Sequence, residues 1–209
     1  MSKSNKYGYS GVDIPTQAFQ ANVGKFDPAE INELVQEDKW TQYGQLELIE
    51  TQTANSSAVD FDSLGSYNVH FLTYTNLTTG TNSDYTQIRL SNDGGTSFEG
   101  GTAYQRGVQY GGTNAGFGAT QSTGTDRFRS LAFANAGTPM NGYVYFYNLG
   151  DSTKYSFITH QSAIGTTYMY YGGQIYTVSE TNNAIRVLNN SGGSFTDGSI
   201  SLYGIKAYS

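Results

Sequence analysis

The 209-residue sequence has no cysteine, only two histidines and only three prolines. The lack of cysteine excludes a disulfide framework and any cysteine metal site. The two imidazoles, His70 and His160, are too few for a histidine-rich metal centre, and each lies in an expected strand, where a structural role is the simplest assignment. Asp60 and Asp62 share one strand face, but calcium needs about six oxygen ligands. We therefore expect solvated acids there, and no cofactor or metal.

Charge is also scarce, at 13% of residues, and the net charge is −6. Residues 27–50 hold seven acids against Lys39 alone, whereas the chain beyond residue 50 is nearly neutral. Nothing here makes the basic footprint of a nucleic-acid-binding protein. No apolar run approaches the roughly 20 residues of a membrane span, and MSKSNKYGYSG at the start lacks the apolar core of a signal peptide. We expect no nucleic-acid partner, no membrane insertion and no secretion.

Glycine and tyrosine are abundant instead, with 26 and 18 residues. From residue 45 onward, short apolar segments alternate with turn-rich stretches such as NLTTGTNSD, NDGGTS and NNSGGS. Many short strands with no helices between them are typical of an antiparallel β-sandwich or barrel. We expect residues 45–209 to form one jelly-roll-like β-sandwich domain, with strands at 46–52, 58–64, 68–76, 85–92, 103–110, 127–134, 142–148, 154–160, 166–171, 174–179, 184–189 and 199–207.

The alternation within three of these strands predicts which faces are buried. In 58–64, Val59 and Phe61 share one face and aspartates share the other, which indicates a half-buried strand. Both faces of 68–76 are largely apolar, so we expect a central strand that is covered on both sides. The last strand, 199–207, also has apolar groups on both faces and is expected to be paired inside a sheet.

Two segments of the chain resemble each other. QIRLSNDGGTSF (87–98) and AIRVLNNSGGSF (184–195) align without a gap, and each reads as a strand, a glycine turn and an aromatic residue. They are either two similar hairpins of one Greek-key sandwich or two equivalent binding loops.

The N-terminal region follows a different pattern. KYGYSGVDIPTQAFQANVGKF (6–26) has aromatics without a helix or strand period, and it is too aromatic for an ordinary disordered tail. In FDPAEINELVQEDKW, Asp27 can cap a helix that has Pro28 at its first position and Glu30 in a capping box. We expect an extended docking arm at 1–26 and a short helix with a linker at 27–44. The aromatic anchors that would fill grooves on neighbouring subunits are Tyr7, Tyr9, Phe19, Phe26 and Trp40.

A resemblance links these parts. The run LELIETQTANSSAVDFDSLGSYNVHFLTYTNL, a Gly-Gly turn and the closing ISLYGIKAYS resemble a domain that recurs in tailed-bacteriophage virion proteins. GKFDPAEINELVQEDKW is similar to a short element that precedes appended domains in phage tail proteins. The resemblance covers 45–98 and 184–209, and 24–40 more loosely. It implies a jelly-roll-like sandwich in a virion structural protein of the tail-fibre, baseplate or capsid-decoration type, and it assigns no catalytic residue.

This family implies a set of partners and a location. The arm would order on assembly with other virion proteins, and the protein would be made in the host cytoplasm and end in the virion. We expect a homo-oligomer, with a trimer as the first choice for a fibre-like role. Repeated weak contacts with a host-surface glycan would then add up through multivalency.

Enzyme signatures are absent from the sequence. It has no glycine loop with a Lys-Ser/Thr partner for phosphate and no Gly-x-Ser-x-Gly elbow. The acids near loops, among them Asp84, Asp93, Glu99 and Asp126, form no evident carboxylate pair. We expect no catalysis. Two alternatives stay open: a carbohydrate-binding module and a glycan-degrading appendage protein.

The strongest candidate for a recognition surface is a stretch rich in tyrosine. In YVYFYN, three tyrosines fall on one face, while Val144 and Phe146 fall on the other. TTYMYYGGQIY adds further tyrosines downstream. This surface could stack on sugar rings or contact a sister subunit, or the strands could be buried on both faces. The candidate residues are Tyr143, Tyr145, Tyr147, Tyr168, Tyr170 and Tyr171.

Overall fold

The computed structural model describes residues 29, 32, 46–113 and 116–205, and these ranges bound every structural statement below. Ala29 and Asn32 are helical, in agreement with the short helix expected there. The remaining residues of 27–44 lie outside the described residues. So does the whole of the expected arm with its anchors Tyr7, Tyr9, Phe19 and Phe26, and so does Trp40.

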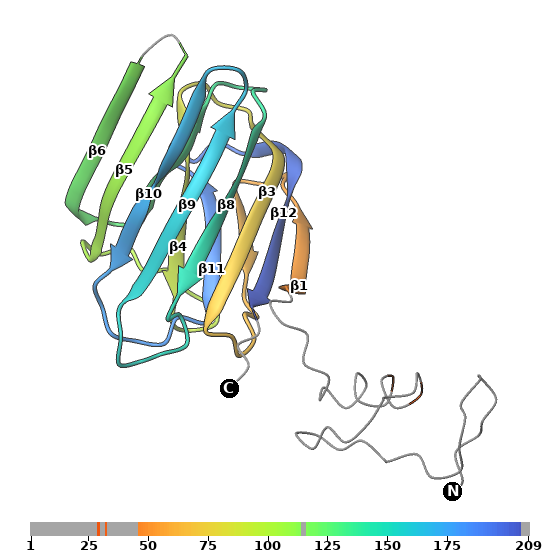
Figure 1. The fold of residues 1–209 in the computed structure, drawn as a ribbon, viewed down its shortest axis with the longest axis vertical. Coiled ribbons are helices and arrows are strands. Elements are labelled where there is room, and N and C mark those ends of the chain that lie inside the picture. The colour runs from red at the N-terminus through yellow and green to blue at the C-terminus, as the bar shows by residue number, and fades with distance from the viewer. Residues whose placement is uncertain (1–28, 30–31, 33–45, 114–115, 206–209) are drawn as a thin grey trace, which may run out of the picture. The chain divides into compact units, whose positions relative to one another are not determined.

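Twelve β-strands make up the described chain from residue 46 onward. They form an eight-stranded sheet in the order β1-β12-β3-β8-β9-β10-β5-β6 and a four-stranded sheet in the order β2-β11-β4-β7. Figure 1 shows β4 and β11 of the smaller sheet lying behind the larger one. The strands are β1 Leu46–Thr53, β2 Ala58–Phe61, β3 Val69–Thr79, β4 Asp84–Ser91, β5 Tyr104–Gly112, β6 Gly116–Thr125, β7 Phe128–Ala134, β8 Met140–Tyr147, β9 Ser156–Ile164, β10 Tyr168–Tyr176, β11 Ala184–Asn189 and β12 Phe195–Ile205.

Every strand pair is antiparallel, and the chain passes repeatedly from one sheet to the other. The expected antiparallel β-sandwich is therefore confirmed. Alternation explains the core, because successive side chains of a strand point to opposite faces. Phe61, Leu72, Val144, Ile185 and Leu202 are fully buried, and they come from both sheets. In β3, β8 and β12, their strand neighbours are more exposed.

The strand boundaries differ from expectation in two places. β6 was not expected, because GFGATQSTGT has almost no apolar residues; it is the edge strand of the larger sheet and pairs only with β5. The two strands expected at 166–171 and 174–179 are one continuous strand, β10. Gly172 and Gly173, which suggested a turn, pair in register with β5 and β9 on either side.

The strand expected to be covered on both sides is β3. It is central, since it pairs with β12 and β8. Only one of its faces is buried, however: His70, Leu72 and Tyr74 point into the core, while Phe71 and its neighbours on the other face are half-buried. The expectation of a second covering layer was wrong, because the aromatic residues on that face cover one another.

The two similar segments are neighbours in space. β4 and β11 pair antiparallel, with Arg89 opposite Arg186. The glycine turns that follow these strands therefore lie at opposite ends of the small sheet. Each turn leads into a strand of the larger sheet, β5 or β12, so the two segments are equivalent connections between the sheets and not hairpins. β12 lies between β1 and β3, as expected from its two apolar faces.

Candidate functional site

The outer face of the eight-stranded sheet, on the side away from the smaller sheet, carries the tyrosines of β8. Tyr143, Tyr145 and Tyr147 are half-buried on this face, whereas Val144 and Phe146 are fully buried in the core. This alternation is the one that the sequence predicted. It follows from the strand period of two, with the two apolar residues turned toward the other sheet.

The tyrosines of β8 continue across the sheet into a larger aromatic surface. The ring of Phe71 in β3 lies 4.6 Å from that of Tyr145 and 6.2 Å from that of Tyr203 in β12. The Tyr143 hydroxyl donates to Oε1 of Gln161 at 2.9 Å, and the Tyr147 hydroxyl lies 3.2 Å from the Thr159 hydroxyl. We call this surface the aromatic face: Phe71, Tyr143, Tyr145, Tyr147 and Tyr203.

A shallow groove adjoins the aromatic face farther along the same side of the sheet. Gly107 of β5 lies opposite Gly173 of β10, so neither strand raises a side chain there. The walls of the groove include Gln109, Gln121 and Tyr171, and two hollows along it have volumes of about 740 and 610 Å³. Amide side chains beside an exposed ring can hydrogen-bond a polar ligand that lies along the strands.

The tyrosines of β10 do not form a common surface with those of β8. Tyr171 is 38% exposed and points outward, but Tyr170 is 4% exposed and points into the sandwich. Tyr168 shares the inward direction of Tyr170. These two rings therefore belong to a different region of the molecule, on the inner side of the large sheet.

That region is a cleft of about 680 Å³ lined from both sheets. Its aromatic wall includes Tyr110 and Tyr170, whose rings stack at 5.5 Å, and Tyr85, whose ring meets Tyr170 edge-on at 6.5 Å. We call it the arginine cleft and define it by Tyr85, Arg106, Tyr110, Arg129, Tyr168 and Tyr170.

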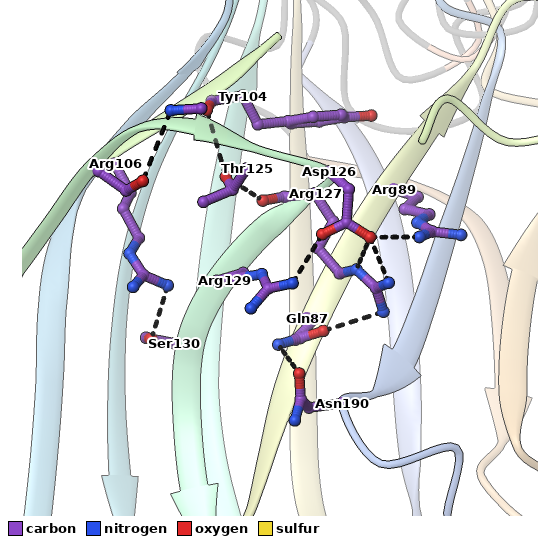
Figure 2. Close-up of polar contacts among 12 residues, drawn as sticks. Gln87, Arg89, Tyr104, Arg106, Thr125, Asp126, Arg127, Arg129, Ser130 and Asn190 are labelled. Atoms are coloured by element: carbon purple, nitrogen blue, oxygen red, sulfur yellow. Dashed lines mark hydrogen bonds and ion pairs between the residues drawn. The ribbon is translucent and has the colours of Figure 1, made fainter. Parts of the chain in front are cut away.

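Three guanidinium groups converge on one carboxylate at the rim of this cleft (Figure 2). Asp126 accepts hydrogen bonds from Arg89 at 2.5 Å, from Arg129 at 2.8 Å and from Nε of Arg127 at 2.9 Å. Partial burial of Asp126 acts to raise its pKa, but the hydrogen bonds from the arginines outweigh burial and hold the pKa well below the ordinary value. Asp126 stays ionised throughout the physiological range.

Arg106 has a different environment. Its Nη1 donates to the Ser130 hydroxyl at 3.4 Å and its Nη2 to the Thr120 hydroxyl at 3.2 Å, and both partners are neutral. No carboxylate pairs with it within residues 46–113 and 116–205. Burial, together with the nearby charge of Arg129, lowers the pKa of Arg106 from its ordinary value. In Figure 2, Arg129 lies between Arg106 and Asp126.

Three of the other acids singled out in the sequence, Asp60, Asp84 and Asp93, have structural partners. Asp60 forms a two-point ion pair with Arg186, at 2.7 and 2.6 Å. Asp84 accepts hydrogen bonds from the amide and hydroxyl of Ser191. Asp93 binds the Ser97 amide within its own turn. No cluster of three or more metal-ligand side chains occurs in the described part of the chain.

Both histidines are buried in the core. Nε2 of His70 lies 2.9 Å from the carbonyl oxygen of Leu64. Burial lowers the pKa of His70, and it lowers the pKa of His160 to about 4. Both rings are therefore neutral near pH 7 and pack as structural groups.

Comparison with known proteins gives no family. The chain matches no protein-family model and no curated protein. Among solved structures, an endo-β-1,4-glucuronan lyase from the fungus Trichoderma reesei is 11% identical, with a TM-score of 0.24, over 78% of this chain and 86% of the other. The CBM2 module of the evolved Dit protein of Lactobacillus casei BL23 phage J-1 is 10% identical, with a TM-score of 0.22, over 80% and 83%. These scores carry no functional argument.

The arginine cleft is the feature that was not predicted from the sequence. Its arginines are spread from residue 89 to residue 129, and only the D-R-F-R run at 126–129 places two of them near an acid. That run was a usable signal, because alternation puts Arg127 and Arg129 on one side of a strand. Arg106 lies in β5 of the larger sheet and meets Arg129 through the packing of the two sheets, which no local pattern reveals.

Proposed function

We propose that this protein is a structural component of a bacteriophage virion that displays its β-sandwich on a tail, fibre, baseplate or capsid surface and contacts a host-surface glycan through the aromatic face. The observation that carries the proposal is the row of half-buried rings on the outer side of the eight-stranded sheet. No other layer of the described chain covers this side. Such a surface supports binding of a glycan without catalysis.

The geometry suits a sugar chain. Ring faces offer flat apolar area with hydroxyls at the edge, and tyrosine supplies this contact at low entropic cost. The adjoining groove adds amide donors and acceptors from Gln109 and Gln121. Each such contact is weak, so several copies in an oligomer, a trimer in our proposal, would be needed to hold a cell surface.

Assembly completes the proposal. The region of residues 1–26 would dock on other virion proteins, and the protein would be made in the host cytoplasm before it joins the particle. Among the described residues, no helix is long and apolar enough to cross a membrane.

The test replaces Tyr143, Tyr145 and Tyr147 with Ser and follows subunit mass and cell adsorption separately. Tyr155→Ser is the matched control, because Tyr155 is 46% exposed and lies outside the aromatic face. Loss of adsorption with an unchanged oligomer supports the proposal. Loss of the oligomer instead assigns the face to a subunit interface. If neither changes, the aromatic face has no role of either kind and the proposal fails.

A further inference from the structure

The structure also contains a basic site on the opposite side of the large sheet. We infer that the arginine cleft binds an acidic sugar unit, whose carboxylate pairs with Arg106 and Arg129 while its ring lies against the tyrosines. This inference does not depend on the aromatic face, which lies on the outer side of the sheet. It adds a ligand class, carboxylated saccharides, that the proposed function leaves open.

The first argument is the distribution of charge. The sequence has five arginines, and four of them gather at this cleft and its rim, in a chain whose net charge is −6. Asp126 pairs with three of them, Arg89, Arg127 and Arg129. Arg106 bonds only neutral hydroxyls, so one carboxylate balances four guanidinium groups and the cluster is left positive. This excess of positive charge favours the binding of an anionic ligand.

Three of these arginines are also incompletely satisfied. The Nε atoms of Arg89, Arg106 and Arg129 are buried and have no hydrogen-bond partner among the described residues. Buried polar groups are normally paired, so unpaired donors indicate a missing acceptor. Arg106 in particular has only two long bonds to neutral hydroxyls. A carboxylate offers the planar pair of oxygens that guanidinium groups bind best.

The third argument is the aromatic wall. Tyr85, Tyr110, Tyr168 and Tyr170 line the same cleft as Arg106 and Arg129. Rings of this kind stack on the C–H face of a pyranose, and their hydroxyls suit its polar rim. The volume of about 680 Å³ lies in the range of ordinary small-ligand sites. An inorganic anion would leave most of this wall unused, so the sugar ring is the better fit.

An acidic peptide is the other class of ligand that the charge allows. A synthetic peptide with the sequence of residues 27–50, which holds seven acids, represents that class. The four tyrosines favour a saccharide, because a run of acidic side chains needs no aromatic wall. The peptide is therefore tested as a competitor of the saccharide.

The experiment is calorimetric titration of the full-length chain with oligogalacturonate, its fully methyl-esterified form and inorganic phosphate. The ester keeps the ring and removes the charge. We expect the acid to bind at least about tenfold more tightly than the ester, as loss of a charge-assisted contact predicts. Added salt should weaken binding of the acid only. Arg106→Gln should lower the affinity by at least about tenfold, since glutamine is shorter and carries no charge to pair with a carboxylate.

The control is Lys154→Gln, which removes one positive charge at a site 60% exposed and outside the cleft. It should leave the affinity unchanged, and thermal melting checks that both variants fold. Equal binding of acid and ester overturns the inference. So does binding of phosphate alone, or displacement of the oligogalacturonate by a peptide of residues 27–50. If the Tyr143/Tyr145/Tyr147→Ser variant loses acid binding while Arg106→Gln keeps it, the saccharide binds the aromatic face, and only this inference fails.

Discussion

β8 and β10 belong to the same sheet, are separated only by β9 and are both rich in tyrosine, yet they use their tyrosines differently. β8 turns all three outward and buries Val144 and Phe146. β10 turns Tyr168 and Tyr170 inward and leaves Met169 and Tyr171 outside. From composition alone, the tyrosines of both strands would be assigned to one surface.

The difference follows from what lies opposite each strand. The smaller sheet has four strands and cannot cover all eight of the larger one. β8 lies near the middle of the large sheet and fills a dry core, which takes aliphatic and phenyl groups. β10 lies toward the β5–β6 end, where the arginine cleft opens and a ring with a hydroxyl suits a half-polar wall. The same residue type therefore marks an outer surface in one strand and a cleft wall in the other.

The largest effect on stability should be the difference between substitutions on the two faces of β8. Phe146→Ala leaves a cavity in the core and should lower the free energy of unfolding by about 3–5 kcal/mol. Tyr145→Ala removes ring contacts at a half-buried surface, with Phe71 of β3 and with Tyr143 and Tyr147 of its own strand, and should cost at most about 1 kcal/mol. Denaturant unfolding of the two variants checks the contrast. Equal losses would mean that the aromatic face is as buried as the core.

A smaller effect on stability should come from protonation of His160. This residue lies in β9, between β8 and β10, and its side chain faces inward. Its pKa is about 4 in the folded chain because of burial, against 6.5 for the free side chain. The unfolded chain thus binds more protons, so stability is complete above pH 6.5 and falls as the pH drops toward 4. The loss should reach about 3 kcal/mol.

Unfolding measured from pH 7 to pH 4 tests this dependence. His160→Gln should flatten most of it, and the lowered pKa of His70 should leave a shallower slope of the same sign. Carboxylates such as Asp126 contribute only at lower pH, because their pKa values are already below the ordinary one. A wild-type stability that does not change over this range would contradict the burial of His160.

The smallest effect on stability should come from alanine substitutions at Gly172 and Gly107, two glycines of the groove region. A Cβ on Gly172 would lie 2.4 Å from the carbonyl oxygen of Gly107, so Gly172→Ala should destabilise by about 1–3 kcal/mol. A Cβ on Gly107 would meet nothing closer than 4.0 Å, and Gly107→Ala should stabilise the strand by up to about 1 kcal/mol. Thermal melting of both variants checks the signs. Destabilisation by Gly107→Ala would show that the groove is filled.

The sequence by itself determined the class of fold and most of the strands. Period-two alternation is a local property, so it placed Val144 and Phe146 inside and the tyrosines of β8 outside, and it put β12 within a sheet. It failed at β6, whose glycine, serine and threonine residues carry no apolar period, and at Gly172 and Gly173, which look like a turn but pair as a strand. The docking arm and the oligomer stay predictions.

Only the tertiary structure decided which tyrosines share a surface and where the arginines meet. Arg106 and Arg129 are 23 positions apart in the sequence, and Arg89 and Asp126 are farther apart still. They converge because β4 and β7 pair in the small sheet, while β5 lies in the other sheet, facing them across the sandwich. The order of strands in a sheet depends on how the strands cover one another's apolar faces. This condition involves the whole chain, so no single stretch of sequence determines it.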